Sequence, residues 1–294
     1  MSNYKKNNKC PDFFIVGAPK SGTTSFYHYL DGCDEIYMSD IKEPNYFSCS
    51  DIKNQNLYYK VKSVCDYDQY LSLFGNASTE QLRGEASVSY LYYPEVASKI
   101  YRYNQNAKII IALRNPVERA ISHFEMDSRL GYVDKSLNQV LEGGDDNFYQ
   151  QYIKLGLYYD QVKRYLDVFG EDQVKIFLFD EIVEDSYSVF LQILLFLNVD
   201  ESEFCFDGVI YNDAIEGKNK YISFLYRNTS FRCFVSKLIP ENIKLYLKAL
   251  FFKKSIKKTV DCEIKEKLFC FYKDDIGKLQ KLINRDLSHW VDAK

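Results

Sequence analysis

Residues 12–24 read Asp-Phe-Phe-Ile-Val-Gly-Ala-Pro-Lys-Ser-Gly-Thr-Thr. The apolar run 13–16 is short and continuous, which is typical of a buried strand in a parallel sheet. A turn with glycines at Gly17 and Gly22 follows, and apolar residues then recur at helical spacing over 23–30. The stretch therefore predicts a strand, a glycine-containing loop and a helix. This arrangement directs backbone N–H groups and the positive end of a helix toward a phosphate.

The loop differs from the phosphate-binding loop of nucleoside triphosphatases. That loop has a lysine directly after its second glycine, whereas this chain has Thr23 there and its lysine earlier, at Lys20. Those enzymes also hold Mg²⁺ through an acidic residue after a later strand, but the strongest later strand, 108–113, is followed by Arg114. We therefore expect the loop to hold a phosphate-like group without a metal, with a cation on the bridging oxygen. An ordinary turn of an α/β protein is the alternative.

Composition argues against several classes of protein. The 294 residues carry 38 Lys and Arg against 41 Asp and Glu, a net charge of −3, which argues against a general nucleic-acid binder. The chain has no run of 18 apolar residues, and segment 1–10 lacks the apolar region of a secretory signal. We therefore expect a cytoplasmic protein, and the abundance of Lys, Asn, Ile and Tyr suggests a bacterial one.

The eight cysteines are scattered and form no Cys-x-x-Cys pair. Their spacing argues against a zinc site. Without a visible export signal, we expect them to be reduced thiols in the core.

Strands and helices alternate up to about residue 200, which predicts a parallel sheet with crossover helices. We expect one domain, with an α/β core over 12–210 and a mainly helical C-terminal portion over 211–294. Further strands are expected at 35–38, 83–87, 108–113 and 174–179, and helices at 67–74, 94–101, 115–124, 136–141, 147–155, 158–169, 185–197 and 261–287.

A carboxylate follows the second expected strand, within Lys42-Glu43-Pro44. Pro44 keeps Glu43 in an extended conformation and out of a helix. Loops that follow strands in α/β folds gather at the carboxyl edge of the sheet, where ligands bind. We therefore expect Glu43 to face the same crevice as Lys20. A solvated loop carboxylate is the alternative.

Arg114 ends the 108–113 strand, and Asn115 and Pro116 are typical of a helix start. An arginine there is well placed to bind a phosphate through two N–H groups. Ser122, about two turns into the helix, reaches the same anion only if the helix runs alongside it. Alternatively, Arg114 forms an ion pair at the helix start and Ser122 is a small packing residue.

Segment 237–258 carries seven lysines and one acidic residue, Glu241, with apolar residues between them. We expect a helix here, either docked on the core with its lysines extended into solvent or lying on a membrane surface. The first arrangement is favoured because helices packed on a core are commoner.

Three stretches together resemble the sulfotransferase family, most nearly its carbohydrate branch, which contains the heparan sulfate sulfotransferases and their bacterial relatives. The first is Ala18-Pro19-Lys20-Ser21-Gly22-Thr23-Thr24. The second is Lys42-Glu43-Pro44-Asn45-Tyr46-Phe47, and the third runs from Leu113-Arg114-Asn115-Pro116 to Ser122. The resemblance covers about residues 12–200.

The resemblance implies a P-loop-like fold and PAPS (3′-phosphoadenosine 5′-phosphosulfate) as donor, with PAP (adenosine 3′,5′-bisphosphate) as product and no metal. It implies that Arg114 and Ser122 bind the 3′-phosphate and that Glu43 is the base acting on a carbohydrate hydroxyl. It also implies that the 5′-phosphosulfate is held by Lys20, Ser21, Gly22, Thr23 and Thr24.

Two positions depart from the family. Glu85-Ala86-Ser87 stands where animal heparan enzymes have glutamate followed by lysine, which weakens a heparan-like acceptor. The later basic loop that contacts phosphate has no clear match, and Lys218 and Lys220 are the candidates.

Two other functions remain open from the sequence. One is a small-molecule kinase or nucleotide hydrolase using the same loop, which dependence on ATP and Mg²⁺ would indicate. The other is a nucleotide-binding or membrane-surface module based on segment 237–258.

Overall fold

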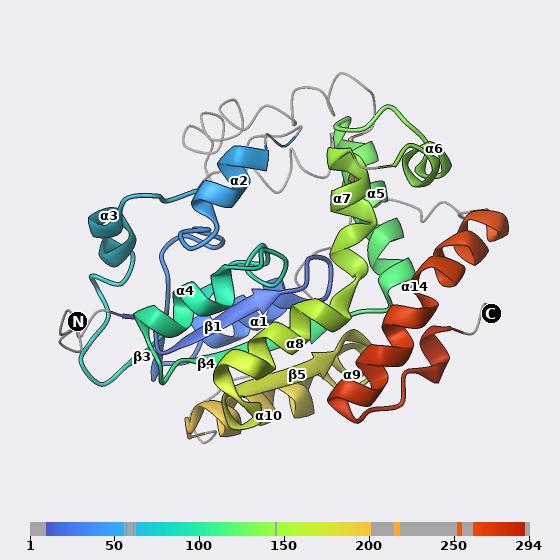
Figure 1. Cartoon of the computed structure of the whole chain (residues 1–294). Coiled ribbons are helices and arrows are strands. Elements are labelled where there is room, and N and C mark those ends of the chain that lie inside the picture. The colour runs from blue at the N-terminus through green and yellow to red at the C-terminus, as the bar shows by residue number, and fades with distance from the viewer. Residues whose placement is uncertain are drawn as a thin grey trace.

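The computed structural model describes residues 10–55, 57, 61, 63–144, 146–200, 215–217, 252–254 and 261–291 of the chain. Its centre is a five-stranded parallel sheet with strand order β2-β3-β1-β4-β5 (Figure 1). The strands are β1 Phe13–Gly17, β2 Ile36–Met38, β3 Leu82–Ala86, β4 Lys108–Leu113 and β5 Val174–Leu178. The predicted fold, a P-loop-like parallel sheet flanked by helices, is confirmed.

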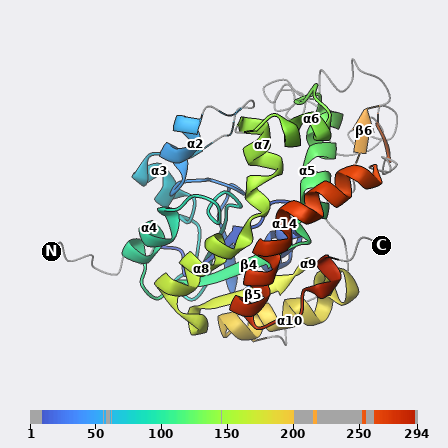
Figure 2. The same cartoon turned by 45° about the vertical axis from the view of Figure 1, so that its right-hand side comes forward.

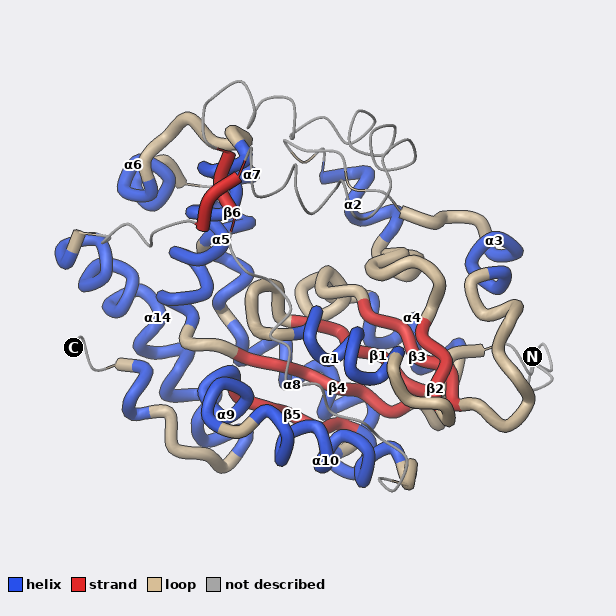
Figure 3. Tube along the Cα trace, turned by 180° about the vertical axis from the view of Figure 1, so that it is seen from behind, coloured by secondary structure: helices blue, strands red, loops and turns tan. Residues whose placement is uncertain are grey.

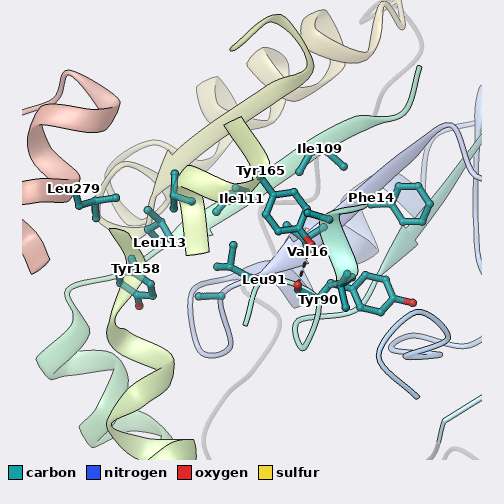
Figure 4. Close-up of a cluster of buried hydrophobic side chains, with 14 of the residues drawn as sticks. Phe14, Val16, Tyr90, Leu91, Ile109, Ile111, Leu113, Tyr158, Tyr165 and Leu279 are labelled. Atoms are coloured by element: carbon teal, nitrogen blue, oxygen red, sulfur yellow. Dashed lines mark hydrogen bonds between the residues drawn. The ribbon is translucent and has the colours of Figure 1, made fainter. Parts of the chain in front are cut away.

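Helices cover both faces of the sheet, which is why the central strands are apolar on both sides. Phe14 and Val16 of β1 belong to one buried cluster, and Phe13 and Ile15 belong to the other. Figure 4 shows part of the first cluster, where side chains of β1 and β4 meet Tyr158 and Tyr165. One face carries α4 Val96–Tyr103, α8 Tyr158–Phe169 and α14 Cys262–Ile283 (Figure 1), and the other carries α1 Thr23–Asp31, α9 Phe179–Glu184 and α10 Ser186–Leu197 (Figure 3).

The structure describes five further helices, of which only α5 is longer than seven residues. They are α2 Cys49–Gln55, α3 Tyr67–Ser72, α5 Pro116–Leu130, α6 Leu137–Glu142 and α7 Asn147–Tyr152, with 3₁₀ turns at Lys154–Gly156, Glu171–Gln173 and Ser288–Trp290. In the described part of the chain, no helix has both the length and the apolar character needed to cross a bilayer.

The start of α5 is fixed locally by its sequence. The Asn115 side chain accepts a hydrogen bond from the Val117 N–H group at 3.0 Å, and Pro116 occupies the first turn. Gly131 ends the helix with a φ of 71°. Because of this cap, α5 begins almost directly after Arg114, the residue that follows β4.

The C-terminal segment braces the sheet and the loops beside it. Asp275 of α14 accepts the Tyr158 N–H group at 2.7 Å and so caps the start of α8. Farther along, Trp290 donates its indole N–H to Asp180 at 2.9 Å and accepts a hydrogen bond from Asn115 at 3.1 Å. Figure 2 shows α14 lying along α8 and α5. The C-terminal helix is therefore part of the same packed unit as the sheet.

Three local elements differ from the sequence predictions. A helix that the sequence did not predict, α2, forms with Cys49 and Ile52 as its buried residues. A helix, α9, follows β5 directly. The structure also contains two short antiparallel strands, β6 Ile215–Gly217 and β7 Phe252–Lys254.

The expectation of one helix over 237–258 is therefore wrong at Phe252–Lys254, because pairing with β6 fixes these residues in a strand. The rest of segment 237–258 lies outside the described residues.

The expectation of reduced core cysteines is also wrong. Cys49 and Cys65, 16 residues apart, form a disulfide with Cα atoms separated by 5.7 Å. The Val64 N–H group donates to the main-chain oxygen of Pro44 at 2.8 Å, which holds the segment of Cys65 close to the one that leads into α2. Among the described free cysteines only Cys33 is buried, whereas the other three are half-buried or exposed: Cys10, Cys262 and Cys270. Cys205 and Cys233 lie outside the described residues.

Candidate active site

The loop between β1 and α1 has a backbone suited to an anion. Gly17 lets the chain pass close to Leu91, since a Cβ atom at position 17 would lie 2.8 Å from that of Leu91. Gly22 has a φ of 90° and precedes α1, whose first turn is not capped by any side chain. Because the first N–H groups of a helix have no partners within it, this end of α1 suits a phosphate or sulfate.

Ser21 adds a buried polar atom that lacks a partner. Its side chain is 0% exposed, and its Oγ atom makes no hydrogen bond. A buried hydroxyl without a partner costs about 1–3 kcal/mol. Because Ser21 does not line the cavity, the fit to a phosphate-like group rests on the uncapped first turn of α1, which follows the same loop.

Lys20 lies inside the loop with a φ of 69°. Its Nζ atom donates to the Sδ atom of Met126 on α5 at 3.3 Å, and a thioether is a weak acceptor. Burial lowers the pKa of Lys20 and Arg129 lowers it further, whereas the carboxylates of Asp127 and Glu43 raise it. A bound anion would offset the cost of burial and favour the charged ammonium.

Arg114 extends from the end of β4 and contacts both the loop and α5. Its Nη2 and Nε atoms donate to Glu118 at 2.9 and 3.2 Å, and its Nη1 atom donates to the main-chain oxygen of Lys20 at 3.4 Å. The guanidinium also lies 4.4 Å from the ring centre of Phe179. The ion pair at the helix start is therefore present, but Glu118 is 57% exposed and easily replaced by a stronger anion.

One cavity of about 560 Å³ connects these groups. This volume is typical of a small-molecule site. Ser21 is buried and does not line the cavity. The other described site residues that were predicted from the sequence do line it: Lys20, Gly22, Thr23, Thr24, Glu43, Arg114 and Ser122. The structure therefore brings the loop after β1, the loop after β2 and one face of α5 to a single space.

Glu43 reaches this cavity from the loop after β2. Its φ of 61° lies in the left-handed region, so the expectation of an extended backbone before Pro44 is wrong. Its Oε1 atom pairs with Lys42 at 2.8 Å, and its side chain is 37% exposed. The Glu43 N–H group donates to the main-chain oxygen of Ala86 at 2.9 Å, which ties the loop to the end of β3. The Glu43 carboxylate is therefore partly exposed to solvent and also forms part of the cavity wall.

The aromatic residues near Glu43 divide into core and cavity positions. Phe47 and Tyr90 are buried in the main hydrophobic cluster, and Tyr46 packs against that cluster. Tyr92 and Tyr93 line the cavity. Only the last pair is placed to contact a ligand.

Three polar residues of α5 were not singled out in the sequence. Arg119, His123 and Asp127 are spaced by four and are all buried. The Nε2 atom of His123 lies 3.8 Å from Oδ2 of Asp127, which also accepts the Tyr152 hydroxyl at 2.9 Å. Burial lowers the pKa of His123 well below its usual range, so its imidazole is neutral. The four-residue spacing of these polar side chains, in the helix that carries Ser122, was the sequence pattern that could have identified them.

Lys218 and Lys220 lie outside the described residues. Their predicted contact with the donor stays a prediction.

The sequence and the fold were compared with known proteins. The sequence model of the sulfotransferase domain family matches residues 10–282. The chain is 34% identical over 114 residues to the membrane-associated sulfotransferase kil1 of Dictyostelium discoideum, and 28% identical over 149 residues to carbohydrate sulfotransferase 15 of Homo sapiens. Each alignment covers 39% of this chain, but only 22% and 27% of those proteins, so the chain spans about a quarter of their length.

A solved structure extends the similarity to nearly the whole chain. A sulfotransferase from Alicyclobacillus acidocaldarius superposes with a TM-score of 0.71 at 32% identity, covering 96% of this chain and 99% of the other. Since both the domain match and the superposition extend over almost all of the sequence, this chain belongs to the sulfotransferase family.

Proposed function

We propose that the enzyme transfers the sulfuryl group of PAPS to a hydroxyl of a carbohydrate or glycoconjugate. One observation carries the proposal. Lys20 and Glu43 come from loops after two different strands, yet they line the same cavity. The cavity therefore presents both a cation that can bind the donor and a carboxylate that can accept the proton of the acceptor hydroxyl.

The donor would be held at two positions. The loop of Lys20, Ser21, Gly22, Thr23 and Thr24 would receive the 5′-phosphosulfate, and the uncapped first turn of α1 supports this role. Arg114 and Ser122 would bind the 3′-phosphate, which would displace the exposed Glu118 carboxylate from the guanidinium. Lys218 and Lys220 are proposed to contact the same phosphate.

In the reaction, the acceptor oxygen forms a new bond to sulfur as the bond between sulfur and the bridging oxygen breaks. The acceptor hydroxyl loses its proton to Glu43, a general-base role that contributes about 10²–10⁴-fold. The bridging oxygen leaves with the 5′-phosphate and gains negative charge. Lys20 and the N–H groups of the loop would stabilise that charge.

Three features support a carbohydrate acceptor. Tyr92 and Tyr93 line the cavity that Glu43 also lines, and aromatic faces stack well on sugar rings. A carboxylate base, with no histidine beside it in the sequence, suits the carbohydrate branch that the motifs resemble. One relative is itself named a carbohydrate sulfotransferase.

Calorimetric titration with PAP tests the donor, with AMP and ATP–Mg²⁺ as controls. We expect micromolar binding of PAP without added metal and much weaker binding of AMP, because AMP lacks the 3′-phosphate. Tight binding of ATP–Mg²⁺ with no response to PAP would overturn the donor assignment and favour a kinase or nucleotide hydrolase.

Radiolabelled PAPS tests the acceptor separately. Neutral glycosides, a lipid-linked saccharide, an acidic polysaccharide, a phenol and a steroid alcohol would be offered in parallel. Label on any saccharide supports the proposal, whereas label on the phenol or steroid alone would overturn the acceptor class.

A further inference from the structure

A second carboxylate, Glu85 of β3, lies beneath the loop that carries Glu43. It is 0% exposed and forms no ion pair with a described Lys or Arg. Instead it accepts hydrogen bonds from the Tyr70 hydroxyl, from the Ser87 hydroxyl at 2.7 Å and from Tyr90. Burying a carboxylate costs free energy. We therefore expect this cluster to have a function besides packing.

The cluster binds the Glu43 loop through two backbone N–H groups. The Ser87 hydroxyl accepts the Asn45 N–H group at 3.0 Å, and the Tyr90 hydroxyl accepts the Phe47 N–H group at 3.2 Å. Two of the three hydroxyls that contact Glu85 therefore also hold the loop.

Asn45, held by Ser87, in turn restrains the backbone of Glu43. Its side chain is 2% exposed, and its Nδ2 atom donates to the main-chain oxygen of Glu43 at 2.8 Å. The Asn45 Oδ1 atom accepts the Ser89 hydroxyl at 2.6 Å. With its N–H group on Ala86, Glu43 is thus held through both its backbone polar groups.

The backbone of the loop needs such support. Glu43 and Asn45 have φ values of 61° and 54°, in the left-handed region that residues other than glycine rarely adopt. Strained conformations of this kind persist only where surrounding contacts over-determine them, and they concentrate at functional sites.

We propose that Glu85 is a positioning residue for the Glu43 carboxylate, acting through Ser87 and Tyr90. It orients two hydroxyls, these hydroxyls hold residues 45–47, and Asn45 holds Glu43 against the cavity. This role rests on the proposed function, in which Glu43 takes the proton of the acceptor.

The surroundings of Glu85 also give the role a pH dependence. Burial raises the pKa of Glu85 to about 7. When ionised, it accepts the Ser87 O–H and leaves a Ser87 lone pair for the Asn45 N–H; when protonated, it competes as a donor. Among the residues that the structure describes, the titratable groups around it are four tyrosines, from α3, the loop after β3, α4 and α8: Tyr70, Tyr90, Tyr103 and Tyr165.

A matched pair of tyrosine variants tests the proposal. Tyr90→Phe removes the hydroxyl that accepts the Phe47 N–H group. Tyr165→Phe removes an equally buried hydroxyl that donates to the main-chain oxygen of Tyr90 at 2.9 Å and does not touch the loop (Figure 4). Ser87→Ala breaks the contact with Asn45.

We expect Tyr90→Phe and Ser87→Ala each to lower kcat by about tenfold or more, because small displacements of a catalytic group are costly. PAP affinity should stay within about twofold of wild type, since the donor loop is untouched. Tyr165→Phe should keep the wild-type kcat. Glu85→Gln places an N–H donor where the carboxylate has an acceptor, as the protonated acid does. Its kcat at pH 8 should therefore already be as low as that of wild type below pH 7, and it should not change between these pH values.

Hydrogen exchange reports on the loop without any reaction. In Ser87→Ala and Tyr90→Phe, exchange should rise in the peptide spanning 43–47 and stay unchanged in the peptide spanning 20–24. Unchanged exchange at 43–47, or a loss of kcat in Tyr165→Phe equal to that in Tyr90→Phe, would overturn the proposal. If the wild type fails to bind PAP, the donor assignment fails, and the exchange at 43–47 still decides whether the cluster holds the loop.

Discussion

The Nη1 atom of Arg114 lies 3.4 Å from the main-chain oxygen of Lys20, so a hydrogen bond joins the residue that ends β4 to the loop that follows β1. The two strands are neighbours and parallel in the sheet. Their carboxyl ends therefore meet at one edge, and the two cations of the proposed donor site are built on adjacent strands. A rigid sheet sets their separation, which suits a donor with two anionic groups.

Lys20→Ala should lose turnover rather than donor affinity. Its proposed role is to stabilise charge on the leaving oxygen, so we expect kcat to fall by about 10²–10³-fold and PAP affinity to change much less. Steady-state kinetics at saturating PAPS and calorimetry with PAP measure the two effects. Lys163→Ala on α8 is the control, because Lys163 is a surface lysine paired with Asp167. A normal kcat in Lys20→Ala would remove this lysine from the chemical step.

Arg114→Ala should mainly raise the KM for PAPS, by about tenfold to a hundredfold, which is the value of a charged hydrogen bond. Glu118→Gln is its matched control, because it removes the same ion pair from the other side and leaves the guanidinium in place. We expect Glu118→Gln to bind the donor at least as well as wild type. Unchanged donor affinity in Arg114→Ala would show that the 3′-phosphate binds elsewhere.

Glu43→Gln should lower kcat by about 10²–10⁴-fold, the usual contribution of a general base. The substitution keeps the size and hydrogen-bonding capacity of the side chain, so PAP affinity should not change. The exposed Glu95→Gln, at the start of α4, serves as the control. Turnover close to wild type in Glu43→Gln would exclude it as the base.

The buried Glu85 should make stability depend on pH. Its pKa rises from 4.5 to about 7 on folding, so the folded state holds this proton more tightly than the unfolded state. Its stabilising contribution is complete below pH 4.5 and is lost as the pH rises to 7, a decrease of about 3 kcal/mol. Denaturant unfolding at several pH values should show a steeper decrease over this range in wild type than in Glu85→Gln. Parallel curves for the two proteins would contradict the assignment.

Asp275→Ala should destabilise the fold by about 1–2 kcal/mol, because it removes the cap that α14 supplies to α8. The adjacent Asp274→Ala is the control, since Asp274 is exposed. Thermal unfolding of both variants measures the difference. Equal melting temperatures for the two variants would mean that the cap does not contribute to stability.

Much of the fold could be predicted because each central strand is a short apolar run between turn residues. The segments at Phe13–Gly17 and Lys108–Leu113 are buried on both faces, so their sequences carry no polar alternation. The helix α2 could not be predicted, because Ile52 is its only strongly apolar buried residue. The Cys49–Cys65 disulfide was missed because loop packing, rather than sequence spacing, brings the two thiols together.

By itself, the sequence determined the order of strands and helices and the separate motifs at Lys20, Glu43 and Arg114, since both depend on residues close together in the chain. The tertiary structure alone decided that these motifs share one cavity, because only the parallel sheet brings the carboxyl ends of its strands to one edge. It also decided what surrounds Glu85. Of the tyrosines around this carboxylate, Tyr90 is close to it in the sequence, but Tyr70, Tyr103 and Tyr165 come from α3, α4 and α8, which only the fold brings to Glu85.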